Sequence, residues 1–181
     1  MKIVTTPNPI LNAPSQQIFK IDKQVLDFIE EMKKVLLATD NPKGVGLAAP
    51  QVGKNWQIFI TKPYEKSVIK VFLNPKIIEK SKEVTDGVPE RDRKLEGCLS
   101  IPGVWGMVKR YQTIKLQYKT PDNKDHSQVF AGFMATIIQH ETDHLNGRLF
   151  PSRTLEQKGK LYKMTHDQKG EEELEELKLT P

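Results

Sequence analysis

The sequence predicts an α+β fold, in which antiparallel β-sheets pack around a buried central helix and a second helix lies near the N-terminus. Short segments rich in β-branched and aromatic residues recur along the chain, as they do in strands. Residues 22–36 carry apolar side chains at helical spacing, whereas the first half of residues 132–146 is apolar around most of a helix. A helix of the second kind is buried. We expect one domain over residues 1–165, followed by a charged tail over residues 166–181.

The first predicted element is a helix that begins after Asp22. Aspartate at an N-cap accepts hydrogen bonds from free backbone amides, and the apolar residues that follow are Val25, Phe28, Ile29, Met32, Val35 and Leu36. The helix ends before Asn41-Pro42, because proline disfavours helical backbone at the preceding residue. Residues 44–53 hold three glycines and predict a loop or an irregular sheet edge. Strand-like composition follows in residues 57–62, 69–73 and 76–78.

The second half of the chain begins with a charged segment, residues 84–94, that predicts a surface loop. Residues 113–119 alternate apolar and polar side chains, which is the period of a half-buried strand. The helix predicted over residues 132–146 ends at Gly147, in the position where glycine commonly terminates a helix. The acidic stretch after Gly170 predicts a short exposed helix or a frayed end.

Composition and charge narrow the class of protein. The apolar content of 37% and the charged content of 28% are typical of a soluble globular chain. No segment has the roughly 20 apolar residues of a membrane span, and the N-terminus has no apolar signal region, so we expect the cytoplasm. The single cysteine, Cys98, excludes an intrachain disulfide. The net charge of +5 comes from scattered lysines. It predicts a solvated surface that allows transient ribosome contact, and no DNA or membrane partner.

The strongest chemical signal is the HExxH pattern on the predicted central helix, formed by His140, Glu141 and His144. Helix residues four apart lie on one face, so both imidazoles can bind one ion. Glu141 stands beside that ion as a general base. Three ionisable groups on a buried helix would be costly without such a partner. Asp143 has two interpretations, orientation of a ligand imidazole or a place on the helix surface, and we favour the surface.

A catalytic metal site needs a third protein ligand and an open position. Residues 146–150 contain no histidine, so the pattern with a third histidine soon after the motif is absent. A downstream glutamate remains open as an alternative. Cys98 is the upstream candidate, since a thiolate beside two imidazoles is a common ligand set and Gly97 permits close backbone approach.

Three segments together resemble the signature motifs of the peptide deformylases. The segments are Gly44-Val45-Gly46-Leu47-Ala48-Ala49-Pro50-Gln51, Glu96-Gly97-Cys98-Leu99-Ser100 and His140-Glu141-Thr142-Asp143-His144. Their order and approximate spacing also match, and the similarity runs over residues 3–150. The resemblance implies a metal-dependent hydrolase that removes the formyl group from the N-terminal formyl-methionine of new polypeptides and releases formate.

By resemblance, the metal ligands are Cys98, His140 and His144. Glu141 takes a proton from the attacking water and later delivers it to the leaving amine. The oxyanion is held by the ion, by the side-chain amide of Gln51 and by the backbone N–H of Leu99.

The resemblance also places the substrate. An apolar slot for methionine falls on Val45, Phe133 and Ile137, together with the ring of a ligand histidine. The backbones of Val45 and Gly46 are expected to pair with an extended peptide, and Gly97 is a further substrate-binding position. Trp105 stands where many bacterial members carry a basic residue near the peptide, so contacts beyond methionine differ in this chain.

The resemblance implies one divalent ion, Fe(II) in the cell, with Zn(II), Ni(II) or Co(II) accepted by purified protein. The ligand set alone would favour zinc over ferrous iron. Two rival interpretations stay open at this point: a metalloprotease with a distant third ligand, and a basic metal-stabilised module that binds RNA. A structural site of the second kind would need a fourth protein ligand, which the sequence does not offer.

Overall fold

The computed structural model describes residues 1–40, 43–88, 94–166 and 172–178. Its helices are α1 (Lys23–Leu37), α2 (Gly132–Leu145) and α3 (Phe150–Glu156), with the 3₁₀ turns η1 (Pro9–Asn12) and η2 (Ala49–Val52). The predicted N-cap is confirmed, because the Asp22 side chain accepts a hydrogen bond from the backbone N–H of Val25. The predicted central helix is also confirmed, with Gly147 at a φ of 66° directly after its end.

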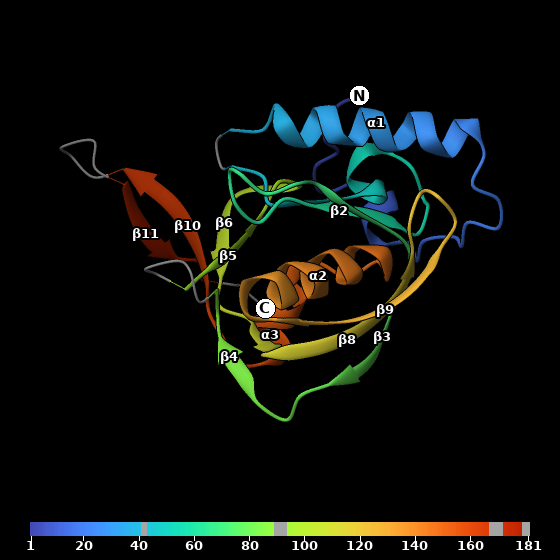
Figure 1. The fold of residues 1–181 in the computed structure, drawn as a ribbon. Helices are drawn as coiled ribbons and strands as arrows, with labels where there is room; N and C mark the ends of the chain where they lie inside the picture. Colours follow the sequence, from blue (N-terminus) through green and yellow to red (C-terminus); the bar gives the residue numbers. More distant parts are fainter. Residues whose placement is uncertain (41–42, 89–93, 167–171, 179–181) are drawn as a thin grey trace.

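The larger sheet has five antiparallel strands, in the order β1 (Gly46–Ala48), β2 (Ile58–Thr61), β3 (Lys70–Lys80), β8 (Thr113–Lys119) and β9 (Asp125–Ala131). Figure 1 shows β2 between α1 and α2. Successive side chains of a strand point to opposite faces, so Ile58 and Ile60 pack in the α1 layer and Phe59 packs in the α2 layer. All four β2 residues are buried, because helices cover both faces. The predicted α+β arrangement around α2 is confirmed.

The smaller sheet has four strands, in the order β11 (Glu172–Glu176), β10 (Leu161–His166), β6 (Ile101–Gly106) and β5 (Glu96–Cys98). A third pair joins β4 (Val84–Asp86) to β7 (Lys109–Tyr111). β1 and β5 are both edge strands of their sheets. Residues of these two strands and of α2 line one cavity.

Four local predictions need to be refined or corrected. Residues 44–53 form the edge strand β1 and the turn η2, so only the interpretation as a sheet edge holds. Residues 69–73 and 76–78 belong to one strand, β3, because a shift of register after Leu73 and a positive φ of 49° at Asn74 absorb the irregularity.

The third correction concerns residues 84–94, of which 89–93 lie outside the described residues. The predicted surface loop contains strand β4 and the buried Val88.

The fourth correction concerns the C-terminal tail. The acidic residues Glu172–Glu176 form a strand, because β10 offers a free edge with which Leu174 and its neighbours pair. Of the predicted tail, residues 167–171 and 179–181 lie outside the described part, and the domain boundary after residue 165 stays a prediction.

Candidate metal centre

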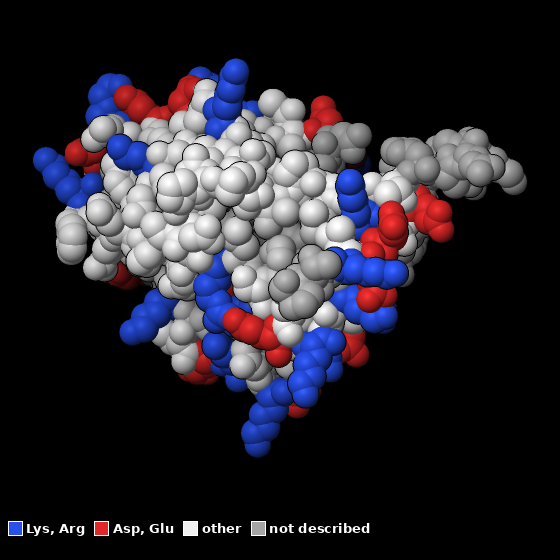
Figure 2. Space-filling view, turned by 180° about the vertical axis from the view of Figure 1, so that it is seen from behind, with Lys and Arg blue, Asp and Glu red and all other residues white. Residues whose placement is uncertain are grey.

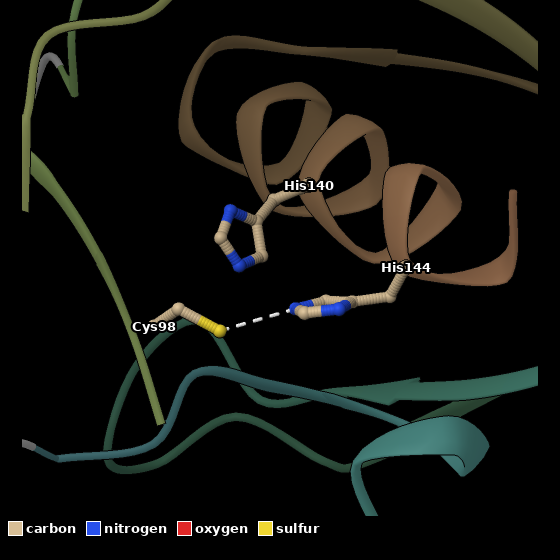
Figure 3. A group of neighbouring side chains, drawn as sticks. All are labelled: Cys98, His140 and His144. Carbon is tan, nitrogen blue, oxygen red and sulfur yellow. Dashed lines mark hydrogen bonds between the residues drawn. The ribbon is translucent and has the colours of Figure 1, made fainter. Parts of the chain in front are cut away.

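Three side chains from two elements converge on one point. His140 and His144 extend from the same face of α2, because they are one helical turn apart. Cys98 ends the edge strand β5 and faces them (Figure 3). The candidate ligand atoms all lie within 4.8 Å of one another, and Cys98 Sγ is 3.1 Å from His144 Nε2. The predicted ligand set is therefore brought together in space.

The chemistry of this donor set fits a divalent ion. Ligand atoms of a tetrahedral thiolate–imidazole site lie about 3.6 Å apart, which these side chains reach with small adjustments. Burial by itself would raise the pKa of Cys98, but His144 and His140 outweigh burial and lower it to about 5. The thiol is thus a thiolate at neutral pH, which is the form that binds metals. Among the described residues, this is the one cluster of metal-binding side chains with such geometry.

Glu96 orients one of the ligands. Its Oε2 lies 3.0 Å from His140 Nδ1. Burial would raise the pKa of Glu96, but the charge and hydrogen bonds of Arg110, helped by His140, lower it to about 2. The ionised carboxylate can only accept, so His140 Nδ1–H donates to it and Nε2 is left for the metal.

A buried network of charges supports this orientation. Arg110, on β7, donates from Nε and Nη2 to the two Glu96 oxygens, at 2.8 and 2.9 Å, and from Nη1 to Asp143 at 2.6 Å. Asp143 also accepts from Arg153, on α3. The guanidinium therefore connects the strand that carries Cys98 to the helix that carries the histidines. The prediction that Asp143 serves the helix surface is wrong, since it is only 5% exposed.

Glu141 lies inside the site as a lone carboxyl group. It is 3% exposed, and its Oε2 has no hydrogen-bond partner among the described residues. Burial raises its pKa to about 7, against the opposing pull of His140 and His144. The carboxyl group lies against the Cα of Gly46: a Cβ built there would be 2.8 Å from Glu141 Cδ. Glycine at this position of β1 therefore makes room for the carboxylate.

Gln51 reaches the same place from η2. Its Oε1 accepts from the backbone N–H of Ala48 at 2.8 Å. Its Nε2 donates toward Cys98 Sγ at 3.4 Å and Ser100 Oγ at 3.3 Å. The amide is buried, at 1% exposure, and its N–H₂ group faces the metal ligands. Gln51 therefore braces the β1–η2 turn with one end and directs donors into the site with the other.

An open cavity lies beside these groups. The predicted slot residues Val45, Phe133 and Ile137 all line it, and so do Leu99, Gly46 and Gly97. Val45, Phe133 and Ile137 also pack with Val88 in one apolar cluster. All residues assigned to the site from sequence are thus brought together.

Sequence reasoning missed four members of the site. Glu96 and Ser100 lie inside a quoted motif, and their place next to Cys98 was the available signal. Arg110 and Val88 carried no signal, because a lone arginine and a lone valine in charged segments are ordinarily solvated or peripheral. The distant third ligand of a metalloprotease is not needed, since Cys98 already lies 3.1 Å from His144.

The comparison with known proteins agrees with this geometry. The sequence profile of the polypeptide deformylase family matches residues 1–160. The peptide deformylase of Borreliella burgdorferi is 38% identical over 150 residues, covering 83% of this chain and 85% of that protein. The peptide deformylase of Desulfotalea psychrophila is 35% identical over 167 residues, covering 90% of this chain and 92% of that protein.

Solved structures give the same result for the fold. A peptide deformylase from Synechococcus elongatus, in complex with actinonin, is 34% identical with a TM-score of 0.75, covering 84% of this chain and 78% of that one. The Thermotoga maritima enzyme is 30% identical with a TM-score of 0.74, covering 84% and 95%. With its Cys–His–His centre, its buried glutamate and these relatives, the chain belongs to the polypeptide deformylase family.

Proposed function

We propose that Cys98, His140 and His144 hold one divalent ion, and that Glu141 moves the proton when N-formyl-methionyl peptides are hydrolysed. The activity follows from the family: the chain is a peptide deformylase, a metal-dependent hydrolase that removes the N-terminal formyl group from nascent polypeptides. The observation that carries the residue roles is the convergence of three ligand side chains next to a buried, unpartnered carboxyl oxygen and an apolar slot.

The ion would be Fe(II) in the cell, whereas purified protein would also carry Zn(II), Ni(II) or Co(II). A bound divalent ion supplies Lewis acidity, which lowers the pKa of water and polarises a carbonyl oxygen. The chain itself supplies a thiolate and a His140 ring whose orientation is set by Glu96. A thiolate beside iron is sensitive to oxidation, which supports a reducing cytoplasm as the working compartment.

Glu141 is suited to carry the proton. A general base works best when its pKa lies near the working pH, and burial raises the pKa of Glu141 to about 7. Its Oε2, which has no hydrogen-bond partner in the described part of the chain, would take a proton from the attacking water. The same carboxyl group then delivers that proton to the amine that leaves as formate forms.

Gln51 and Leu99 would stabilise the oxyanion. The Gln51 side chain is held by Ala48, so its N–H₂ group needs little reordering when negative charge develops. Leu99 follows Cys98 directly in the chain and lines the cavity, so its backbone N–H would be the second donor.

The formylated methionine would lie between the two sheets. Its side chain would enter the slot of Val45, Val88, Phe133 and Ile137, an apolar cluster that suits an unbranched apolar side chain. Among the described strands β1 and β5 lie at the edges of their sheets. We therefore assign pairing with an extended peptide to the backbones of Gly46, Gly97 and Val45, which directly precedes β1.

The distribution of surface charge indicates which kinds of partner the chain can bind. Figure 2 shows Lys and Arg mixed with Asp and Glu around the margin of one face, with no concentrated basic patch there. A face of mixed charge does not support a dedicated RNA-binding module, and transient ribosome contact stays a prediction. None of the described helices is long and apolar enough to cross a membrane.

The test measures formate release from formyl-Met-Ala-Ser by protein purified and loaded with Fe(II) without oxygen. We expect turnover by the native chain, and Glu141→Gln should keep its metal while losing nearly all turnover. Glu79→Gln, on the surface of β3, is the matched control and should behave like the native chain. Complete metal loss in a folded Glu141→Gln protein would make Glu141 a ligand and contradict the assignment.

A further inference from the structure

Ser100 lies against the side-chain amide of Gln51, in the turn that joins β5 to β6. It is the second residue after Cys98, and it is fully buried. Its Oγ lies 3.3 Å from Gln51 Nε2, and within the described residues this is the one hydrogen bond of the Ser100 side chain. An amide nitrogen can only donate, so the hydroxyl oxygen accepts.

The Gln51 amide is held at both ends. A primary amide offers one acceptor oxygen and two N–H donors. The oxygen accepts from the backbone N–H of Ala48 at 2.8 Å, so the amide cannot flip without losing that bond. The nitrogen has Ser100 Oγ at 3.3 Å and Cys98 Sγ at 3.4 Å, which is one partner for each N–H. The hydroxyl of Ser100 thus leaves one N–H of Gln51 for the side on which the metal ligands lie.

The backbones of the same two residues are tied to one segment. The backbone N–H of Val4 donates to Gln51 O at 2.8 Å, and the backbone N–H of Thr6 donates to Ser100 O at 3.0 Å. Gln51 and Ser100 are 49 residues apart in the chain. The N-terminal segment therefore bridges η2 and the turn between β5 and β6, so the distance between the amide and the hydroxyl does not depend on one contact alone.

Orientation matters for a donor that stabilises developing negative charge. Such a donor is most effective when it already points to the place where the charge will form, because no free energy is then spent on reordering. The bond to Ala48 fixes only the oxygen end of the Gln51 amide. A second fixed contact, on the nitrogen, sets the rotation of the amide plane.

We propose that Ser100 is a positioning residue for deformylation, acting through Gln51. Its hydroxyl accepts one N–H of the amide and thereby directs the other N–H toward the oxyanion. This inference rests on the proposed role of Gln51, and it adds the residue that sets the direction of the Gln51 donor. Without the hydroxyl, kcat should fall by about tenfold, which is less than the loss expected for removal of the donor itself. KM should change little, because the amide acts mainly in the transition state.

The first test measures steady-state formate release from formyl-Met-Ala-Ser by Fe(II)-loaded proteins. We expect Ser100→Ala to lower kcat by about tenfold, with KM and metal affinity nearly unchanged. In a Gln51→Ala background, Ser100→Ala should lower kcat no further. Ser100→Thr keeps the hydroxyl and should recover most of kcat. The matched control is Ser15→Ala, which removes a buried hydroxyl that has no partner among the described residues and should behave like the native chain.

A second measurement reports on the amide itself. In Zn(II)-loaded protein that carries isotope-labelled glutamine, the side-chain N–H signals of Gln51 are identified by NMR from their absence in Gln51→Ala. In Ser100→Ala one of these two signals should move upfield and exchange faster with water, because its acceptor is lost. Ser15→Ala should leave both signals in place. If Ser100 only stabilised the fold, Ser100→Ala would lower the melting temperature without changing the Gln51 signals.

The outcomes separate the levels of the argument. If the native chain releases no formate, the deformylase activity itself fails. If metal-loaded Gln51→Ala keeps the native kcat, the oxyanion role of Gln51 fails, and the role of Ser100 fails with it.

Other outcomes refute the role of Ser100 alone. If Gln51→Ala is slow but Ser100→Ala has the native kcat, or if the two losses are additive, Ser100 does not act through Gln51. Weaker metal binding by Ser100→Ala would assign the hydroxyl to the turn that carries Cys98 and would also refute the proposal. If Ser100→Ala misfolds, Ser100→Cys decides in the same way, because a thiol is similar in size and is a weak acceptor.

Discussion

Gly46→Ala would shift Glu141, the proposed general base, without changing its carboxyl group. The backbone of Gly46 lies outside the positive-φ region, so alanine is tolerated there. The added Cβ would meet the Glu141 carboxyl group, with 2.8 Å to Cδ and 3.0 Å to Cγ. The far end of a side chain can move, so we expect the protein to fold and the carboxylate to withdraw from the metal ligands.

The size of the effect follows from these distances. Glu141 Cδ must retreat by at least 0.6 Å, the difference between 2.8 Å and the 3.4 Å at which ordinary contact begins. Misplacement of a catalytic group by about 1 Å costs about 10²-fold in rate, or about 2.7 kcal/mol of transition-state stabilisation. Thermal stability should change little, since Gly→Ala also reduces the entropy of the unfolded chain.

The assay is steady-state formate release with a double-mutant cycle. Glu141→Asp already withdraws the carboxylate, so Gly46→Ala should lower kcat far less in that background than in the native chain. Additive losses would show that Gly46 does not act through Glu141. A higher KM with native kcat would show that the new methyl group obstructs the peptide, and would refute the reasoning about the carboxylate.

Three further changes test other parts of the site. Gln51→Ala should lower kcat by about 10²-fold with a smaller change in KM. It should also lower the melting temperature, because the Ala48 N–H loses its acceptor. An unaltered kcat would exclude the oxyanion role. Arg110→Met removes the buried cation shared by Glu96 and Asp143 and leaves them only His140 and Arg153 as partners, so we expect a loss of about 3 kcal/mol and at least about tenfold weaker metal binding. Arg148→Met is the control, because the ion pair of Arg148 with Glu156 is exposed. Its loss should lower the free energy of unfolding by less than about 1 kcal/mol. In the metal-free protein, folding lowers the pKa of Glu96 from its ordinary value of 4.5 to about 2, so the stabilisation from its carboxylate is complete above pH 4.5 and is lost as pH falls toward 2. Urea unfolding at a series of pH values should show this slope, and Glu96→Gln should remove the share of Glu96.

Some helices and strands could be predicted from the local sequence alone, because their residue pattern fits only one kind of secondary structure. The helix of residues 132–145 was predictable because its apolar half and its terminal glycine agree. Strand β8 was predictable because its burial alternates with the period of two that the pattern indicated. The pairing of His140 and His144 on α2 was predictable for the same reason: a spacing of four residues on a helix places two imidazoles together before any tertiary contact forms.

Other elements depend on partners that are distant in the chain. β9 is exposed along most of its length and has almost no apolar pattern of its own, yet it is a strand because β8 pairs with it from end to end. The acidic residues Glu172–Glu176 are extended because β10 offers a free edge, although their composition alone suggested a helix or a frayed end. Backbone pairing, unlike amphipathic burial, leaves little trace in the identity of exposed side chains.

The same distinction applies to the candidate site. The sequence by itself determined which residues have the chemistry of ligand, base and donor, because thiolate, imidazole, carboxylate and amide are properties of the side chains. Only the tertiary structure decided how they are held. Arg110 pairs with Glu96 and Asp143 across 14 and 33 residues of chain, Gly46 receives the carboxyl group of Glu141, and Trp105 lies across Gly97. Each of these contacts depends on the packing of separate strands against α2, and a distance between such elements is set by the whole core and not by any local pattern.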